Sequence, residues 1–214
     1  MSDSYSPGRR LAFQFLLDSV LLFALTGALI WPLFRIEYLD QWHSIESIFI
    51  ADARFLAAHW PLPSWQPDWY CGTRFNNIYP PGLRYGTAGL SLLLNVSTAR
   101  AYHLYIALLY CTGVVGLYWM VRIGSGSRFW SWIAAAVTTL SSPIFFFIAQ
   151  FRDDYAAFRH MPVRLGALFI YGEGPHMSAL ALIPFALAAS WFGVRQGQPV
   201  ALGLAGILAA LIVA

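Results

Sequence analysis

The sequence has little charge and no lysine. Charged residues make up 11% of the 214-residue chain, and all 13 basic side chains are arginines. Nucleic-acid binding normally requires a clustered basic stripe, and these arginines are scattered, so no nucleic-acid partner is expected. The chain also has two cysteines, too few for a disulfide framework or a metal knuckle. Cys111 lies inside an apolar run, so pairing with Cys71 is not expected.

Apolar residues dominate instead. They account for 58% of the chain, and aromatic residues for 17%. Several runs reach the roughly 20 residues needed to cross a bilayer core. The fold class predicted is all-α, a polytopic transmembrane helical bundle. The expected spans cover 11–34, 101–121, 129–151 and 176–194, and a fifth begins near 200. The first span lacks a signal-peptide cleavage pattern, so we expect it to remain as an anchor.

The last apolar run is short. About 15 residues remain between its start and the end of the sequence, fewer than a span needs. The chain is therefore predicted to be the N-terminal part of a longer protein, with a single transmembrane domain over 1–214.

The arginines predict an orientation. Cytoplasmic loops carry an excess of basic residues, and one set of span ends holds Arg9, Arg10, Arg122, Arg128 and Arg195. The N-terminus and these ends are predicted to be cytoplasmic, so the loops 35–100 and 152–175 lie outside. The second outer loop goes against the rule, because it contains three arginines of its own, Arg152, Arg159 and Arg164.

The first outer loop, 35–100, is far longer than compact connections need, and long loops tend to be functional or disordered. Its first part, "LDQWHSIESIFIADARFLAAHW", has apolar residues at helical spacing and predicts an amphipathic helix lying on the membrane surface. The apolar positions are Trp42, Ile45, Phe49, Ala53 and Leu56. The proline-rich segment "WPLPSWQPDWYCGTRFNNIYPPG" predicts an ordered irregular loop. The segment "GTAGLSLLLNV" predicts a short re-entrant or surface helix.

Ionisable residues crowd into "EYLDQWHSIES", directly after the first span. Glu37, Asp40 and His43 follow at intervals of three and can share part of a helix face, and Glu46 lies one turn further. Asp40 has two interpretations. It is a helix cap or a solvated interfacial residue, or it is a carboxylate held at the membrane edge as a general base or cation ligand.

A second acidic cluster lies in "FRDDYAAFRH", at the outer end of the third span. Asp153 and Asp154 are flanked by Arg152 and Arg159. These side chains form ion pairs that fix a loop, or they bind a divalent cation such as Mg²⁺ or Mn²⁺, with the arginines for a phosphate. Two acidic clusters on the same predicted membrane face favour the second interpretation.

Two further motifs lie on this face. The motif "YGEGPH" contains Glu173 and His176 and has two interpretations. Gly174 and Pro175 only start a helix, with Glu173 near its positive end, or the glycines let the backbone approach a ligand closely at a helix start that favours anions. The loop aromatics, which include Trp65, Trp69 and Tyr79, are interfacial anchors or stacking surfaces for sugar rings.

Asp18 lies about two turns into the first span. A carboxylate is costly in lipid, so it is expected to face protein. Arg10, Gln14 and Asp18 are spaced by four, which predicts a local structural network.

The layout resembles the GT-C superfamily of multispan glycosyltransferases, which use lipid-linked sugars. The resemblance rests on three features. A first span is followed by a long outer loop, that loop carries an acidic residue directly after the span, and a second acidic pair follows the third span. The sequences "DQWHS", "PLPSWQPDWYCGTRFNNIYPPG" and "YGEGPHMSALALIPFALA" are similar to those of a bacterial branch of membrane proteins labelled as related to 6-pyruvoyl-tetrahydropterin synthase. The second acidic motif is Asp-Asp here, not the Asp-x-Asp or Glu-x-Asp common among oligosaccharyl transferases.

The resemblance implies a transferase in the bacterial inner membrane that uses a polyprenyl phosphate-linked sugar on the extracytoplasmic side. Asp40 matches the catalytic acidic residue of the first outer loop, with His43 or Glu46 orienting it. Asp153 and Asp154 match the second acidic motif. The substrate-binding residues expected are Arg152, Arg159, Trp65, Trp69, Tyr79, Glu173 and His176. Two alternatives stay open: a transporter or flippase for a lipid-linked substrate, and a non-catalytic membrane assembly subunit.

Overall fold

The structure, a computed structural model, describes residues 7–37, 44–69, 71–75, 81–140, 162 and 172–213. Long helices make up one part of it: α1 (Pro7–Leu29), α4 (Thr98–Ser125), α5 (Arg128–Leu140), α9 (Gly174–Gln196) and α10 (Pro199–Val213). Three of them are long and apolar enough to cross a membrane, over Arg10–Leu29, Thr98–Ser125 and Gly174–Gln196. These lengths support the prediction of a helical membrane protein.

Local signals explain the helix ends. Ser97 precedes α4, and its side chain accepts a hydrogen bond from the Arg100 backbone N–H at 3.2 Å, which satisfies a donor that a helix start leaves unpaired. Gly126 and Gly197 end α4 and α9 in the left-handed conformation, with φ of 71° and 60°. Glycine adopts this conformation without the cost that a Cβ would impose.

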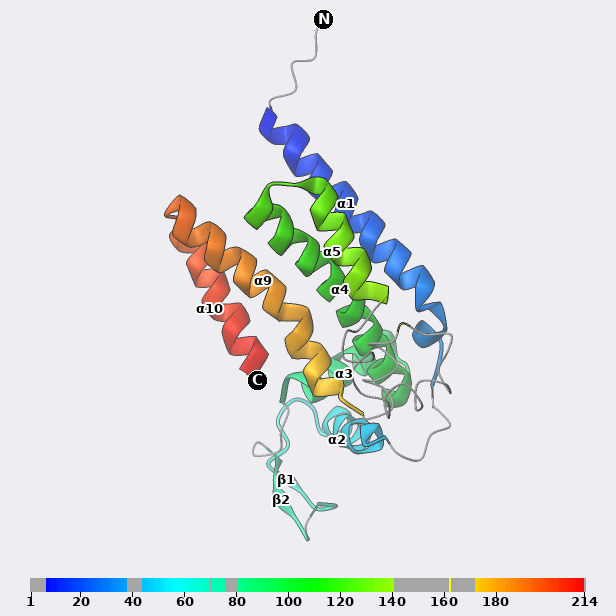
Figure 1. Ribbon diagram of the computed structural model, residues 1–214. Helices are drawn as coiled ribbons and strands as arrows, with labels where there is room; N and C mark the ends of the chain where they lie inside the picture. The colour runs from blue at the N-terminus through cyan, green and yellow to red at the C-terminus, as the bar shows by residue number, and fades with distance from the viewer. Residues whose placement is uncertain are drawn as a thin grey trace, which may run out of the picture.

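The long helices run alternately up and down (Figure 1). Helix α4 is central and contacts α1, α5 and α9, while α10 packs on α9. The start of α1, the α4–α5 turn and the α9–α10 turn lie at one end of the bundle, which we call the basic end because Arg10, Arg122, Arg128 and Arg195 belong to these segments.

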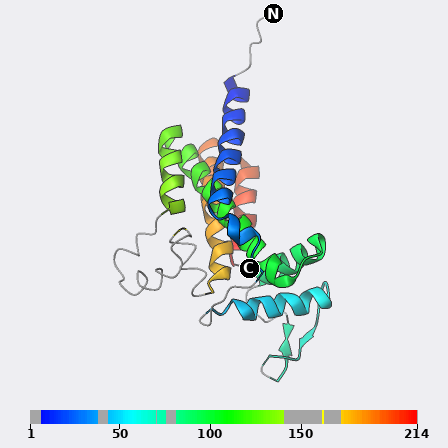
Figure 2. The ribbon, with the colours of Figure 1, turned by 90° about the vertical axis from the view of Figure 1, so that its right-hand side faces the viewer.

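The opposite end carries smaller elements, and we call it the α2 end. They are the 3-10 helix η1 (Trp31–Phe34), α2 (Glu46–Ala58), the two-stranded antiparallel hairpin of β1 (Trp65–Gln66) and β2 (Thr73–Arg74), and α3 (Pro81–Leu94). Trp65 pairs with Arg74 and Gln66 with Thr73. In Figure 2, α2 lies roughly across the ends of the long helices.

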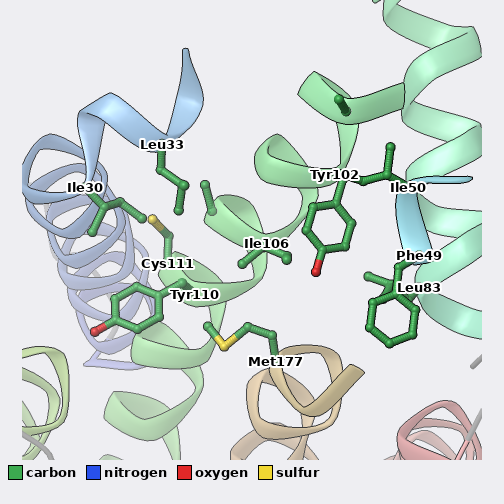
Figure 3. Close-up of a cluster of buried hydrophobic side chains, with 12 residues drawn as sticks. Ile30, Leu33, Phe49, Ile50, Leu83, Tyr102, Ile106, Tyr110, Cys111 and Met177 are labelled. Atoms are coloured by element: carbon green, nitrogen blue, oxygen red, sulfur yellow. The ribbon is translucent and has the colours of Figure 1, made fainter. Parts of the chain in front are cut away.

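A buried apolar cluster joins the α2 end to the bundle (Figure 3). Its members come from η1, α2, α3, α4 and α9, and they include Leu33, Phe49, Leu83, Ile106 and Met177. Burial of apolar side chains is the main stabilising contribution here. The small elements are therefore packed onto the long helices and held in place by them.

Two predictions for the first outer loop are corrected by this packing. The amphipathic helix exists as α2, but Phe49, Ala53 and Leu56 are buried by protein, since α2 contacts α3 and α4. The apolar face therefore does not lie on a membrane surface, and Ile45, predicted to share that face, is 47% exposed. The proline-rich segment, predicted to be irregular, contains the hairpin β1–β2, whose ladder hydrogen bonds satisfy the backbone there.

Asp18 faces protein, as predicted, and is fully buried. Its partners are not the neighbours on its own helix. Its carboxylate accepts hydrogen bonds from the Tyr118 hydroxyl at 2.6 Å and from Arg128 Nε and Nη2 at 2.8 and 2.6 Å. Arg10 and Gln14 are exposed. The network joins α1 to α4 and α5, because a buried carboxylate is stabilised by close donors on whichever helix packs against it.

Candidate functional site

Two segments far apart in the sequence meet at the α2 end. Gly172 has φ +70°, and a Cβ built on it would lie 2.7 Å from the Ile45 backbone nitrogen and 2.9 Å from Ser44 Oγ. The "YGEGPH" motif therefore packs directly against the start of α2. Ser44 Oγ in turn accepts the Glu46 backbone N–H at 3.3 Å. Both views of the ribbon place the start of α9 beside α2 (Figures 1 and 2).

Glu46 forms a buried pair with a residue that the sequence did not single out. Its Oε2 lies 3.4 Å from His103 Nε2, and the side chains of His103 and Glu46 are 0% and 9% exposed. The carboxylate occupies the first turn of α2, where the helix dipole favours negative charge. The pair is too buried to reach a substrate, so its role is to fix the start of α2 against α4.

Glu173 and His176 form the exposed part of the site. They lie three apart at the start of α9, and His176 Nδ1 bonds to Glu173 Oε2. Their side chains are 40% and 65% exposed, respectively. Both groups can therefore contact a ligand, and the backbone N–H groups of the first turn of α9 favour an anion in the same place.

Tyr102 lies between the two acidic positions. Its ring is 1% exposed, and both Glu46 and Glu173 lie within electrostatic range of its hydroxyl. A Cβ on Gly174 would lie 2.5 Å from that oxygen, so the α9 backbone passes directly over the phenol. Tyr102 and His103 are adjacent on α4, and together they contact both segments of the site.

The hairpin tryptophans do not join this group, because the hairpin projects away from the bundle (Figure 1). Trp65 packs its ring on Gly72 and is 53% exposed. Trp69 is half-buried, and its side chain hydrogen-bonds to Asp52. The exposed face of Trp65 is available for stacking at a place separate from Glu173 and His176.

A buried polar cluster beneath the hairpin was missed by the sequence reasoning. Arg84 is 1% exposed, donates from Nη1 to the Phe75 carbonyl at 2.9 Å, and places its guanidinium 4.3 Å from the Phe75 ring centroid. Asp52, also 1% exposed, accepts from Gln66 Nε2 at 3.4 Å. Asp52 lies three residues after Phe49 and four before Leu56, so its place on the apolar face of α2 was the available signal.

Burial sets the ionisation of this cluster. It raises the pKa of the Asp52 carboxyl above its usual value, against the opposing effects of Gln66, Arg84 and Trp69. It likewise lowers the pKa of the Arg84 guanidinium, which Asp52 partly offsets. The cluster joins α2, the hairpin and α3, and it is a structural brace behind the site.

Several predicted site residues lie outside the described residues: Asp40, His43, Tyr79, Arg152, Asp153, Asp154 and Arg159. Among the side chains that the structure describes, no group of three or more His, Cys, Asp or Glu residues could hold a metal ion.

Comparison with known protein families, with curated proteins and with solved structures finds no match. The functional argument therefore rests on the geometry of the α2 end and on the chemistry of its side chains.

Proposed function

We propose that the chain belongs to a GT-C-like glycosyltransferase that uses a polyprenyl phosphate-linked sugar at the α2 end of the bundle. The observation that carries the proposal is the contact of Gly172 with Ser44 and Ile45. It brings two acidic motifs, one carrying Glu46 and one carrying Glu173, to the same end of the helices long enough to span a membrane. A lipid-linked substrate presents its phosphate and sugar at such an end, beside the headgroups.

In the proposed reaction, an acceptor hydroxyl attacks the anomeric carbon of the donor sugar. The bond between that carbon and the phosphate oxygen breaks, and the phosphate leaves with the electron pair. Asp40 takes the hydroxyl proton, a step that typically contributes about 10²–10⁴-fold in rate. Glu46, fixed by His103 at 3.4 Å, holds the start of α2 and so positions the segment that carries this base.

Glu173 and His176 bind the donor. The exposed imidazole can donate to a phosphate oxygen beside the helix start, and the Glu173 carboxylate can accept hydrogen bonds from sugar hydroxyls. Arg152 and Arg159 add charge for the phosphate, with Asp153 and Asp154 as ligands of a divalent cation such as Mg²⁺ or Mn²⁺. Trp65, Trp69 and Tyr79 are proposed as stacking faces for those sugar rings of the substrate that lie away from Glu173 and His176, since Trp65 is exposed on the hairpin.

The proposed setting is the bacterial inner membrane, with a multi-pass topology and the N-terminus in the cytoplasm. The basic end then faces the cytoplasm and the α2 end faces outward. The support is the set of arginines at the basic end, although the 35–100 region at the α2 end carries arginines of its own, Arg35, Arg54, Arg74, Arg84 and Arg100.

The test is mass spectrometry of the lipids that co-purify with the full-length protein. Wild type should carry a polyprenyl phosphate or its glycoside, and Arg152→Ala or His176→Ala should lose it. Asp68→Asn, which neutralises an exposed carboxylate on the hairpin turn, is the matched control and should retain it. Ordinary phospholipids alone, unchanged in every variant, would contradict the proposal and favour an assembly subunit.

The co-purified donor then allows a test of the base. Asp40→Asn should retain the donor and lose nearly all transfer while folding normally, because only proton removal is affected. Transfer that survives Asp40→Asn would remove Asp40 from the chemistry. Movement of the donor across the membrane without transfer would favour a flippase.

A further inference from the structure

The basic end holds a groove that the proposed transferase chemistry does not use. It runs between α1 and the last turns of α4 and α9, and it encloses about 500 Å³. Its walls are largely apolar and aromatic, with Leu11, Phe15, Trp191 and Phe192 among them. Leu11 and Trp191 are 47% and 46% exposed, so the groove is open to the surroundings of the bundle.

Two guanidinium groups from different helices line this groove. Arg122, half-buried near the end of α4, lies 5.7 Å from the centroid of the Phe15 ring. Arg195, exposed near the end of α9, lies 4.6 Å from that of Trp191. An arginine held over an aromatic face keeps its planar N–H edge available for a phosphate. Arg122 donates one hydrogen bond to the Gly126 carbonyl, and a guanidinium has five donors.

Among the residues that the structure describes, no acidic side chain lines the groove to neutralise these cations. Asp18, the carboxylate of α1, is already hydrogen-bonded by Tyr118 and Arg128. The helix dipole favours a cation in the last turn of a helix, and this explains each arginine by itself. It does not explain why both arginines border one apolar groove.

We propose that the groove binds an anionic phospholipid, with its phosphate between Arg122 and Arg195 and an acyl chain along Leu11, Phe15 and Phe192. Guanidinium groups bind phosphate strongly and apolar walls favour acyl chains, and the groove supplies both. It also lies at the ends of helices long enough to span a membrane, which is where headgroups lie. Basic pockets between membrane helices bind anionic headgroups in this way. The site is independent of the proposed transfer reaction at the opposite end.

The test is native mass spectrometry of the detergent-purified protein, titrated with phosphatidylglycerol and separately with phosphatidylcholine. Wild type should bind phosphatidylglycerol with the higher affinity. Binding should weaken about five- to tenfold for each arginine replaced in Arg122→Gln and Arg195→Gln. Arg10→Gln is the matched control, because it removes an exposed arginine from the same end but outside the groove lining. It should leave the affinity unchanged.

Four outcomes would overturn the proposal: equal affinity for phosphatidylcholine, an equal loss in Arg10→Gln, no phosphatidylglycerol bound by wild type, or thermal stabilisation by inorganic phosphate as large as that by the lipid. The last outcome would point to a free anion as the occupant. If Arg122→Gln fails to fold because it loses the bond to Gly126, Arg195→Gln carries the test alone, since Arg195 is exposed and makes its contact with the Trp191 ring.

Discussion

Replacement of Gly172 by alanine tests the contact on which the candidate site depends. Gly172 has φ +70°, and a side chain in the left-handed conformation costs about 1–2 kcal/mol. The new Cβ would also lie 2.7 Å from the Ile45 backbone nitrogen. That atom cannot rotate away as a side chain can, so the two segments must separate, and overpacking of this kind costs about 1–3 kcal/mol. The two costs together predict a loss of about 2–5 kcal/mol.

Gly197→Ala is the matched control. Gly197 has φ +60°, and a Cβ there would meet nothing within 4 Å. It should therefore show only the backbone cost, about 1–2 kcal/mol. The difference between the two variants isolates the contact of Gly172 with Ser44 and Ile45.

Thermal unfolding in detergent measures both variants. Cys111 is buried and Cys71 is exposed, so alkylation of the folded protein blocks Cys71, and a thiol-reactive dye then reports Cys111 as the chain unfolds. Unfolding of such a protein is often irreversible, so the variants are compared at one heating rate. Gly172→Ala should melt about 2–12 °C below Gly197→Ala. Equal melting temperatures would refute the packing of "YGEGPH" on the start of α2, and with it the site.

Three further predictions follow from other contacts. Ser44→Cys combined with Gly172→Cys should form a disulfide that neither single variant forms, seen as a mobility shift under non-reducing conditions. A Cβ at position 172 pushes the two segments apart, but its starting position is 2.9 Å from Ser44 Oγ, and a disulfide places its two Cβ atoms about 3.5–4.5 Å apart, so the sulfur atoms stay within reach. Burial raises the pKa of Asp52, so the folded chain retains this proton where the unfolded chain has released it. The free energy of unfolding therefore falls as pH rises through the Asp52 pKa, and Asp52→Asn should flatten this slope and change nothing at acidic pH, as measured by denaturation across pH. Tyr118→Phe removes a hydrogen-bond donor that lies 2.6 Å from the buried Asp18 carboxylate. It should destabilise the protein by about 1.5–3 kcal/mol in the thermal unfolding assay, and the polyprenyl phosphate donor should still co-purify with this variant.

The long apolar helices could be predicted from the sequence because hydrophobicity is a local property. The runs predicted at 101–121 and 176–194 fall inside α4 and α9. The first span was extended too far, to residue 34, whereas α1 ends at Leu29. Pro32 explains the difference, because proline lacks an N–H and its ring clashes with the preceding turn of a helix. The chain continues there as the 3-10 helix η1 instead.

The site could be predicted only in part. Glu46, Glu173 and His176 were chosen because ionisable residues are conspicuous in an apolar chain, and all three lie at the α2 end. Their arrangement could not be read from the sequence, because the contact between residues 45 and 172 depends on how α2 and α9 pack. His103, the partner of Glu46, looks like an ordinary core residue of an apolar helix. The sequence correctly predicts that Asp18 faces protein, but it does not reveal the partner Arg128, which lies 110 residues further along the chain.

Helix α4 sets the geometry of the site. Of the apolar stretch that qualifies each helix as a candidate span, 44% is buried in α4, against 17% in α1 and 22% in α9. Successive residues of a helix point about 100° apart, so Tyr102 and His103 face two different neighbours. Tyr102 lies against Gly174 of α9, and His103 against Glu46 of α2. A single turn of α4, the most buried of the three candidate spans, therefore fixes both acidic segments. A shift of α4 would move the two segments together, and it would also move Arg122, at the other end of α4, relative to Arg195 of α9.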